Sequence, residues 1–239
     1  MFRALSQRRA RPKNRRMDAE PLSIAVGAEQ VSALLLRPPD AKALFLFAHG
    51  AGVGMSHSSM ASNAAGLAAR GVATLRYQFP YMEKGSRRPD PPRIAHAAVR
   101  AAAAEAERLA PDLPLFAGGR SFGGRMTSQA QADTPLPGVR GLAFLGFPLH
   151  PAGKPGIERA AHLAKVQILM LFVSGDRDAL AERALLEPVV AGLGSRATLH
   201  LVKDADHSLK VPARSGRTPA DTEAEALDAL AGFMLEHGA

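Results

Sequence analysis

Three residues of this 239-residue chain have the types and the order that a serine-based acyl-transfer catalyst needs. Ser121 is the centre of the pentapeptide 119–123, which has the sequence Gly-Arg-Ser-Phe-Gly. A short apolar run precedes it, and a segment able to form a helix follows it. A serine on such a sharp strand-to-helix turn exposes its Oγ, and the glycines avoid a Cβ that would collide with neighbouring elements. Ser121 is therefore the candidate nucleophile.

A serine nucleophile also needs a general base and an acid that orients that base. Asp178 follows the apolar run 168–174, and His207 follows the alternating segment 197–202, so each comes directly after a predicted strand. The loops after parallel strands gather on one edge of a sheet, which would bring both residues to Ser121. We predict that His207 is the base and Asp178 the acid. Asp176 is the alternative acid, and His200 is a weaker candidate because it lies within its strand.

The tetrahedral intermediate of acyl transfer needs two backbone N–H donors. One is predicted to come from Phe122, the residue after the nucleophile. The other is predicted to come from Ala51, in the glycine-rich loop 49–54 that follows the apolar strand 43–48. His49 in that loop is expected to support it by hydrogen bonding rather than to take part in the chemistry.

Other chemistries fit the sequence less well. The eight histidines have no metal-ligand spacing, so we expect no metal. The turn 50–54 resembles a dinucleotide-binding glycine loop, but Met55 stands near where the third glycine belongs, and Arg76 ends the next strand, where an NAD site needs an acid. We therefore expect no cofactor.

Composition limits the compartment and the partners. Without cysteine the chain has neither disulfides nor thiol catalysis, and its longest apolar runs fall far short of the roughly 20 residues of a membrane helix. We expect a cytoplasmic protein without a membrane anchor. Seven of its eight net positive charges lie in residues 1–16, which predicts a disordered basic tail over 1–20, with Met17 as the true start. That tail alone does not predict a nucleic-acid partner.

Strands and helices are predicted to alternate along residues 21–239, which we expect to form a single α/β domain. The pattern predicts a mostly parallel sheet of about seven or eight strands with helices on both faces. Helices are expected near 58–70, 93–110 and 219–236, and a loop over 78–92. The segment 147–166 has room for only one short helix, so no large lid is expected.

Six stretches together resemble the small, lidless α/β-hydrolases related to dienelactone hydrolase, and among them bacterial hydrolases akin to the α/β-hydrolase domain of a subunit of the NSL histone-acetyltransferase complex. The stretches are residues 48–52, 76–82, 118–125, 146–155, 175–180 and 206–208. The resemblance implies that Ser121, Asp178 and His207 form a catalytic triad. Dienelactone hydrolases use a cysteine nucleophile, which this chain lacks, so their specific activity is not carried over.

These observations predict a serine hydrolase that cleaves a carboxylic ester or thioester of a small molecule through an acyl-enzyme. The alternative is a non-catalytic interaction protein that keeps the fold. The loop 83–88 and Arg120 add positive charge near the predicted site. One hypothesis is therefore a preference for anionic acyl substrates, and the other is that the basic loop is simply solvated.

Overall fold

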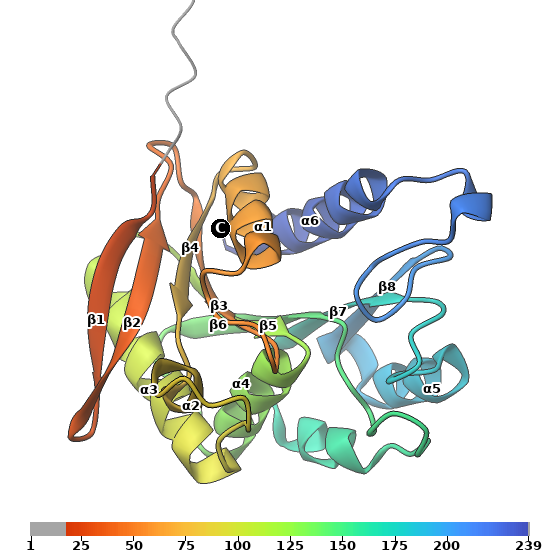
Figure 1. The fold of residues 1–239 in the computed structure, drawn as a ribbon, viewed down its shortest axis with the longest axis horizontal. Coiled ribbons are helices and arrows are strands. Elements are labelled where there is room, and N and C mark those ends of the chain that lie inside the picture. The colour runs from red at the N-terminus through yellow and green to blue at the C-terminus, as the bar shows by residue number, and fades with distance from the viewer. Residues whose placement is uncertain (1–17, 239) are drawn as a thin grey trace, which may run out of the picture.

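The computed structural model of the chain describes residues 18–238, and these residues are built around one eight-stranded sheet (Figure 1). Residues 1–17 of the predicted tail, including Met17, lie outside the described residues. The first strand begins at Glu20, inside the segment that the sequence assigned to the tail. Within residues 18–238, no helix combines the length and the apolar character needed to cross a membrane.

The strand order is β1-β2-β4-β3-β5-β6-β7-β8. The first two strands pair in antiparallel fashion, β2 runs antiparallel to β4, and the remaining six strands are parallel to one another. The strands are β1 Glu20–Val26, β2 Glu29–Leu36, β3 Ala43–Ala48, β4 Val72–Tyr77, β5 Leu115–Arg120, β6 Val139–Leu145, β7 Leu169–Gly175 and β8 Ala197–Val202. The order reverses at β3, and this is where ligand sites form in open α/β sheets.

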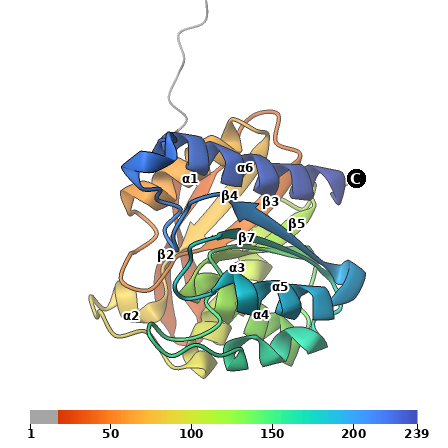
Figure 2. The ribbon, with the colours of Figure 1, turned by 90° about the vertical axis from the view of Figure 1, so that its right-hand side faces the viewer.

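Helices cover both faces of the sheet (Figure 2). On one face lie α1 Ser58–Ala68 and α6 Pro219–Glu236, and on the other lie α3 Pro92–Leu109, α4 Phe122–Asp133 and α5 Arg183–Gly192. A short helix α2, Pro80–Glu83, follows β4. Three 3₁₀ segments complete the described residues: η1 Glu158–Lys165, η2 Gly194–Arg196 and η3 Ala213–Ser215.

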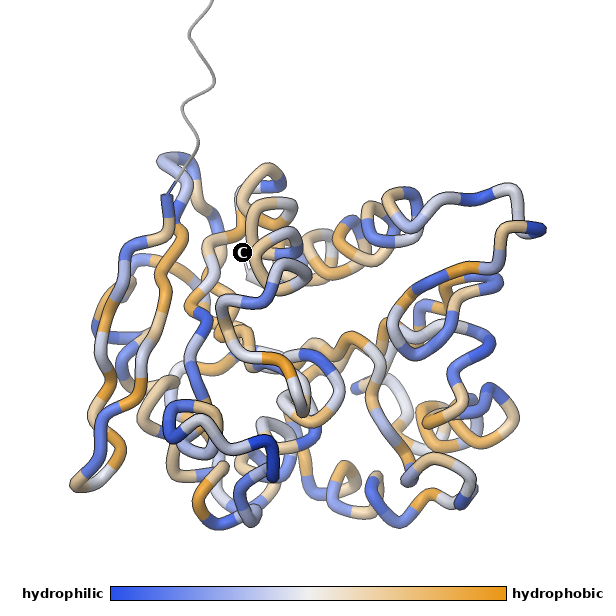
Figure 3. Tube along the Cα trace, in the orientation of Figure 1, coloured by the Kyte–Doolittle hydropathy of each residue, from blue (hydrophilic) through white to orange (hydrophobic). Residues whose placement is uncertain are grey.

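The apolar pattern of the central strands explains the two layers. Every residue of β3 is buried, as expected for a parallel strand with helices on both faces. Its side chains alternate: Leu44 and Leu46 belong to the core under α3 and α4, whereas Phe45 and Phe47 belong to the core under α1 and α6. Figure 3 shows the apolar residues concentrated through the middle of the molecule, with hydrophilic residues in the outer turns.

The α/β prediction is confirmed, and the connection between β6 and β7 holds only the short segment η1, without a large lid. Two details differ from the expectations. The segment 78–92, predicted as a loop, contains α2, which begins at Pro80 because a proline suits the first helical position. The helix α5 had not been predicted, and Pro188 within it is a residue that normally breaks helices.

Candidate active site

Ser121 sits on the tight turn between β5 and α4 in a backbone conformation that side chains rarely adopt. Its φ is 49° and its ψ is −114°. Such a conformation costs about 1–3 kcal/mol, which the surrounding structure must offset. The two flanking glycines are needed to avoid collisions, as the sequence predicted. A Cβ at Gly119 would lie 2.3 Å from the Ala48 oxygen, and one at Gly123 would lie 2.5 Å from the His49 oxygen. The turn therefore packs directly on the end of β3.

The three predicted side chains lie in one hydrogen-bonded chain. His207 Nε2 is 2.9 Å from Ser121 Oγ, and His207 Nδ1 is 2.8 Å from Asp178 Oδ2. Because the Asp178 carboxylate only accepts, it favours the tautomer in which Nδ1 carries the proton and Nε2 accepts from the serine hydroxyl. The Asp178 side chain is fully buried, and its second oxygen accepts from the Leu180 N–H at 2.8 Å.

The sheet and two glycines bring these loops together. Asp178 follows β7 and His207 follows β8, and these strands pair in parallel up to Gly175 and Val202. A Cβ at Gly175 would lie 2.1 Å from the Ala205 oxygen. A Cβ at Gly146, which directly follows the neighbouring β6, would lie 3.2 Å from His207 Cε1. Gly175 thus lets the backbone before His207 approach β7 closely, and Gly146 leaves room for the imidazole ring.

The alternative candidates for the acid and the base, Asp176 and His200, are not part of this hydrogen-bonded triad. Asp176 makes no hydrogen bond to His207, and its Oδ1 is buried without a partner among the described residues. His200 lies within β8 and pairs with Glu225 at 3.0 Å. The residues directly after Asp178 form no helix that it could cap, because α5 begins only at Arg183.

The loop after β3 is held by His49, which is fully buried. Its Nε2 accepts from the Phe79 N–H at 3.0 Å, so the Nδ1 proton is donated to the Gly50 oxygen at 2.8 Å. Burial lowers the pKa of His49 to about 4, and the ring is therefore neutral at pH 7. Ala51 lies exposed in the turn of this loop, and Phe122 is the first residue of α4, whose amide end carries positive potential.

Two residues to which the sequence analysis gave no role in this loop, Arg76 and Gln78, support it through hydrogen bonds to Met55. The Gln78 side chain accepts from the Met55 N–H at 2.9 Å, and the buried Arg76 donates to the Met55 oxygen at 2.9 Å. The Tyr81 ring packs against His49, with ring centroids 6.0 Å apart. The sequence feature that could have predicted this support is the pair of polar residues, Arg76 and Gln78, at the end of the strand that follows the glycine-rich loop.

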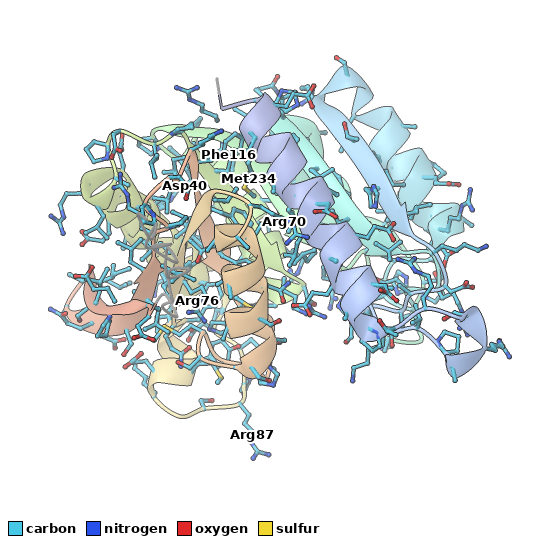
Figure 4. All side chains as sticks on the ribbon, turned by 90° about the horizontal axis from the view of Figure 1, so that it is seen from above. Asp40, Arg70, Arg76, Arg87, Phe116 and Met234 are labelled. Carbon is cyan, nitrogen blue, oxygen red and sulfur yellow. The ribbon has the colours of Figure 1, made fainter. Side chains whose placement is uncertain are left out.

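The two basic elements of the anionic-substrate hypothesis are separate in the structure. Arg87 and Arg88 are exposed, and Figure 4 shows Arg87 pointing away from the body of the molecule. Arg120 is instead partly buried beside Ser121 and lines a cavity. Residues 18–238 contain no group of three or more His, Cys, Asp or Glu side chains arranged to hold a metal ion.

Solved structures with the same architecture come from several bacteria. A lidless α/β serine hydrolase from Xanthomonas campestris has 18% sequence identity and a TM-score of 0.69, with 91% of this chain and 95% of that chain covered. A dienelactone hydrolase from Anabaena variabilis has 22% identity and a TM-score of 0.69, covering 92% and 95%. Est1E from Butyrivibrio proteoclasticus, solved with ferulic acid, has 17% identity and a TM-score of 0.70, covering 90% and 98%.

The similarity to these structures shows the fold, an eight-stranded, mostly parallel sheet with helices on both faces and no large lid. The family follows from the sequence itself, because residues 41–235 match the family model described as an alpha/beta hydrolase domain. That match spans most of the chain, including the turn of Ser121 and the loops of Asp178 and His207. The chain therefore belongs to the alpha/beta hydrolase family.

Proposed function

We propose that this protein is a serine hydrolase that cleaves a carboxylic ester or thioester of a small substrate. The observation that carries the proposal is the hydrogen-bonded chain from Ser121 Oγ through the His207 ring to the buried Asp178 carboxylate. A serine becomes a strong nucleophile when a base lies next to its hydroxyl and an acid holds that base in the right orientation.

The reaction follows from the positions of the donors and acceptors. His207 Nε2 takes the Ser121 proton as Oγ attacks the carbonyl carbon, and Asp178 stabilises the imidazolium that forms. The amides of Ala51 and Phe122 bind the negatively charged oxygen. The imidazolium then gives its proton to the leaving alcohol or thiol, and the acyl group stays on Ser121. Water, deprotonated by His207, releases the acid and restores the serine.

Two observations support the proposed substrate class, one for the type of bond and one for the size of the substrate. The family consists of proteins with a hydrolase domain, and the similar structures include a dienelactone hydrolase and Est1E, which was solved with ferulic acid. The open site, without a large lid over it, suits a small substrate that reaches Ser121 directly from solvent. The proposed substrate class includes oxygen esters and thioesters.

Replacing Ser121 with alanine tests the proposal. Hydrolysis of p-nitrophenyl acetate and of an acetyl thioester should lose about 10⁴-fold or more in kcat, because loss of a nucleophile disables the whole triad. Ser86→Ala, in the loop after α2, is the matched control and should keep the wild-type rate. Equal turnover by Ser121→Ala and wild type would exclude the mechanism, and the absence of turnover in both would favour the non-catalytic interaction protein.

A further inference from the structure

A cavity of about 280 Å³ is lined by Arg120, the residue before Ser121, and lies on the face of the sheet that α1 and α6 cover. Phe116, four residues before Arg120 on β5, packs on this face in the core that includes Met234 of α6 (Figure 4). Side chains four residues apart on a strand point to the same face, so Arg120 also projects toward α1 and α6. The cavity is lined by Val53, His57, Ser59, Asn63, Arg120, Ser208, Leu209, Lys210, Pro219 and Glu223.

Three polar side chains from three different elements meet this cavity without hydrogen-bond partners among residues 18–238. They are the Arg120 guanidinium at the end of β5, the Asn63 amide on α1 and the Glu223 carboxylate on α6. Asn63 is only 4% exposed, and the Oε1 atom of Glu223 is buried without a partner. Of these three side chains, Glu223 supplies a fully buried atom without a partner, and Arg120 and Asn63 present further polar atoms to the same cavity. Buried polar groups are nearly always hydrogen-bonded, so the arrangement indicates a site for a polar ligand.

The positive charge of Arg120 and the negative charge of Glu223 balance each other. Burial lowers the pKa of Arg120, and the nearby carboxylates of Asp206 and Glu223 oppose that shift, so the guanidinium stays charged. Arg120 and Glu223 nevertheless form no ion pair with each other within the described residues. A group with no net charge that offers an acceptor to Arg120 and a donor to Glu223 satisfies both. Hydroxyls do so with little desolvation cost, whereas a carboxylate or an ammonium would first have to be stripped of its water.

The chain neighbours of both reacting residues line the cavity, because Arg120 precedes Ser121 and Ser208 follows His207. His207 must protonate the leaving oxygen, and the residues that directly follow it, Ser208 to Lys210, form part of the cavity wall. An alcohol that departs from the Ser121–His207 pair therefore extends toward Arg120 and Glu223. At about 280 Å³ the cavity has room for a small polyol.

We propose that this cavity is the leaving-group subsite and that it selects a hydroxylated, uncharged alcohol through Arg120, Asn63 and Glu223. The inference rests on the proposed esterase function and narrows its substrate class to esters of small polyols. Arg120 then acts in alcohol recognition rather than in binding an anionic acyl group.

Four acetate esters with three-carbon leaving groups test the subsite: 1-acetylglycerol, propyl acetate, O-acetylserine and 3-acetoxypropanoate. Their kcat/KM values at neutral pH are measured by titration of the acetic acid released. Wild-type enzyme should prefer 1-acetylglycerol to propyl acetate by about tenfold or more, because a site built to bind hydroxyls rejects an analogue that lacks them. The charged esters should be poorer than 1-acetylglycerol.

Variants assign that preference to the cavity. Arg120→Met and Glu223→Met should each lower the ratio of the glycerol rate to the propyl rate about fivefold or more. Glu223→Gln, which preserves shape, serves if the methionine variants do not fold, and it should lower the ratio in the same direction. Glu225→Met is the matched control on α6, because its carboxylate pairs with His200 and Arg217 outside the cavity, and it should keep the wild-type ratio.

Each other outcome overturns the inference in a distinct way. Equal kcat/KM values for the glycerol and propyl esters would show that the cavity does not recognise hydroxyl groups. The same conclusion would follow if the Arg120 and Glu223 variants kept the wild-type preference. A preference for O-acetylserine or 3-acetoxypropanoate would assign a charged ligand instead. Hydrolysis of none of the four esters, together with an unreactive Ser121, would overturn the proposed function itself.

Discussion

The burial of Asp178 determines what its carboxylate can do for His207. The side chain has no access to water, and it is bonded to both the imidazole and the Leu180 N–H. Asp176, two residues earlier, makes no bond to the imidazole. A carboxylate that holds Nδ1–H fixes the tautomer in which Nε2 can accept the serine proton, and an amide at the same place would favour the wrong tautomer.

Asp178→Asn should therefore lower kcat on p-nitrophenyl acetate by about 10²- to 10⁴-fold while the protein stays folded. Asp176→Asn is the matched variant and should change kcat only a few-fold, because that side chain does not touch the histidine. Both are compared by initial rates and by circular dichroism. A large loss in Asp176→Asn with little loss in Asp178→Asn would reverse the assignment of the acid.

Two helical glycines show how closely the elements must approach at the turn that carries Ser121. Gly123 in α4 faces the end of β3, where an added Cβ would lie 2.5 Å from the His49 oxygen, whereas nothing lies within 4 Å of one at Gly232 in α6. Backbone at that distance can move only by shifting β3 or α4, so the position of the nucleophile depends on the missing side chain.

Alanine at these two positions should have opposite effects on the free energy of unfolding. Gly232→Ala should raise it by about 0.5–1 kcal/mol, because alanine is the better helix former. Gly123→Ala should lower it by about 1–3 kcal/mol through overpacking and should also reduce kcat. Urea unfolding measures both. A stabilising effect of Gly123→Ala would mean that the helix and strand are not tightly packed there.

The elements that carry the site were predictable where local pattern and burial agree. The apolar run 43–48 and the alternating run 197–202 match β3 and β8, and helix α6 has the predicted bounds Pro219–Glu236, with a capping box between Thr218 and Asp221. The short helix α2 was missed because tertiary contacts, rather than propensity, hold a four-residue helix.

The cavity by Arg120 could not be derived from the sequence, because it exists only where β5, α1 and α6 meet. The sequence places the positive charge of Arg120 next to the nucleophile, but Asn63 and Glu223 are separated from Arg120 by dozens of residues and belong to no motif. Their lack of hydrogen-bond partners is a property of the packed structure. The positions of residues along the chain could predict that Ser121, Asp178 and His207 act together, but they could not predict which side chains line this cavity.

Across the folded protein, the fully buried His49 and the partly buried His162 link stability to pH. Burial lowers the pKa of both His49 and His162 from the ordinary value of 6.5 to about 4. Between these values the unfolded chain binds a proton at each site and the folded protein does not. Protonation therefore favours the unfolded state, and stability falls as the pH drops from 6.5 toward 4.

The free energy of unfolding should accordingly drop between about pH 7.5 and about pH 5, with His49 contributing on the order of 2 kcal/mol. In His49→Gln, which cannot titrate, the difference between the two pH values should shrink by about that amount, as measured by urea unfolding. His57→Gln, at an exposed histidine, is the control and should leave the difference unchanged. An unaltered difference in His49→Gln would show that the ring is protonated in the folded protein.

Covalent labelling by a fluorophosphonate probe tests most directly whether Ser121 is an activated nucleophile. The native protein should form one adduct, which peptide mass spectrometry locates on Ser121, because only a serine with an adjacent base reacts readily. Labelling should disappear in Ser121→Ala and after heat denaturation, and it should fall sharply in His207→Ala. An unlabelled native protein, or an adduct on another serine, would contradict the proposed mechanism.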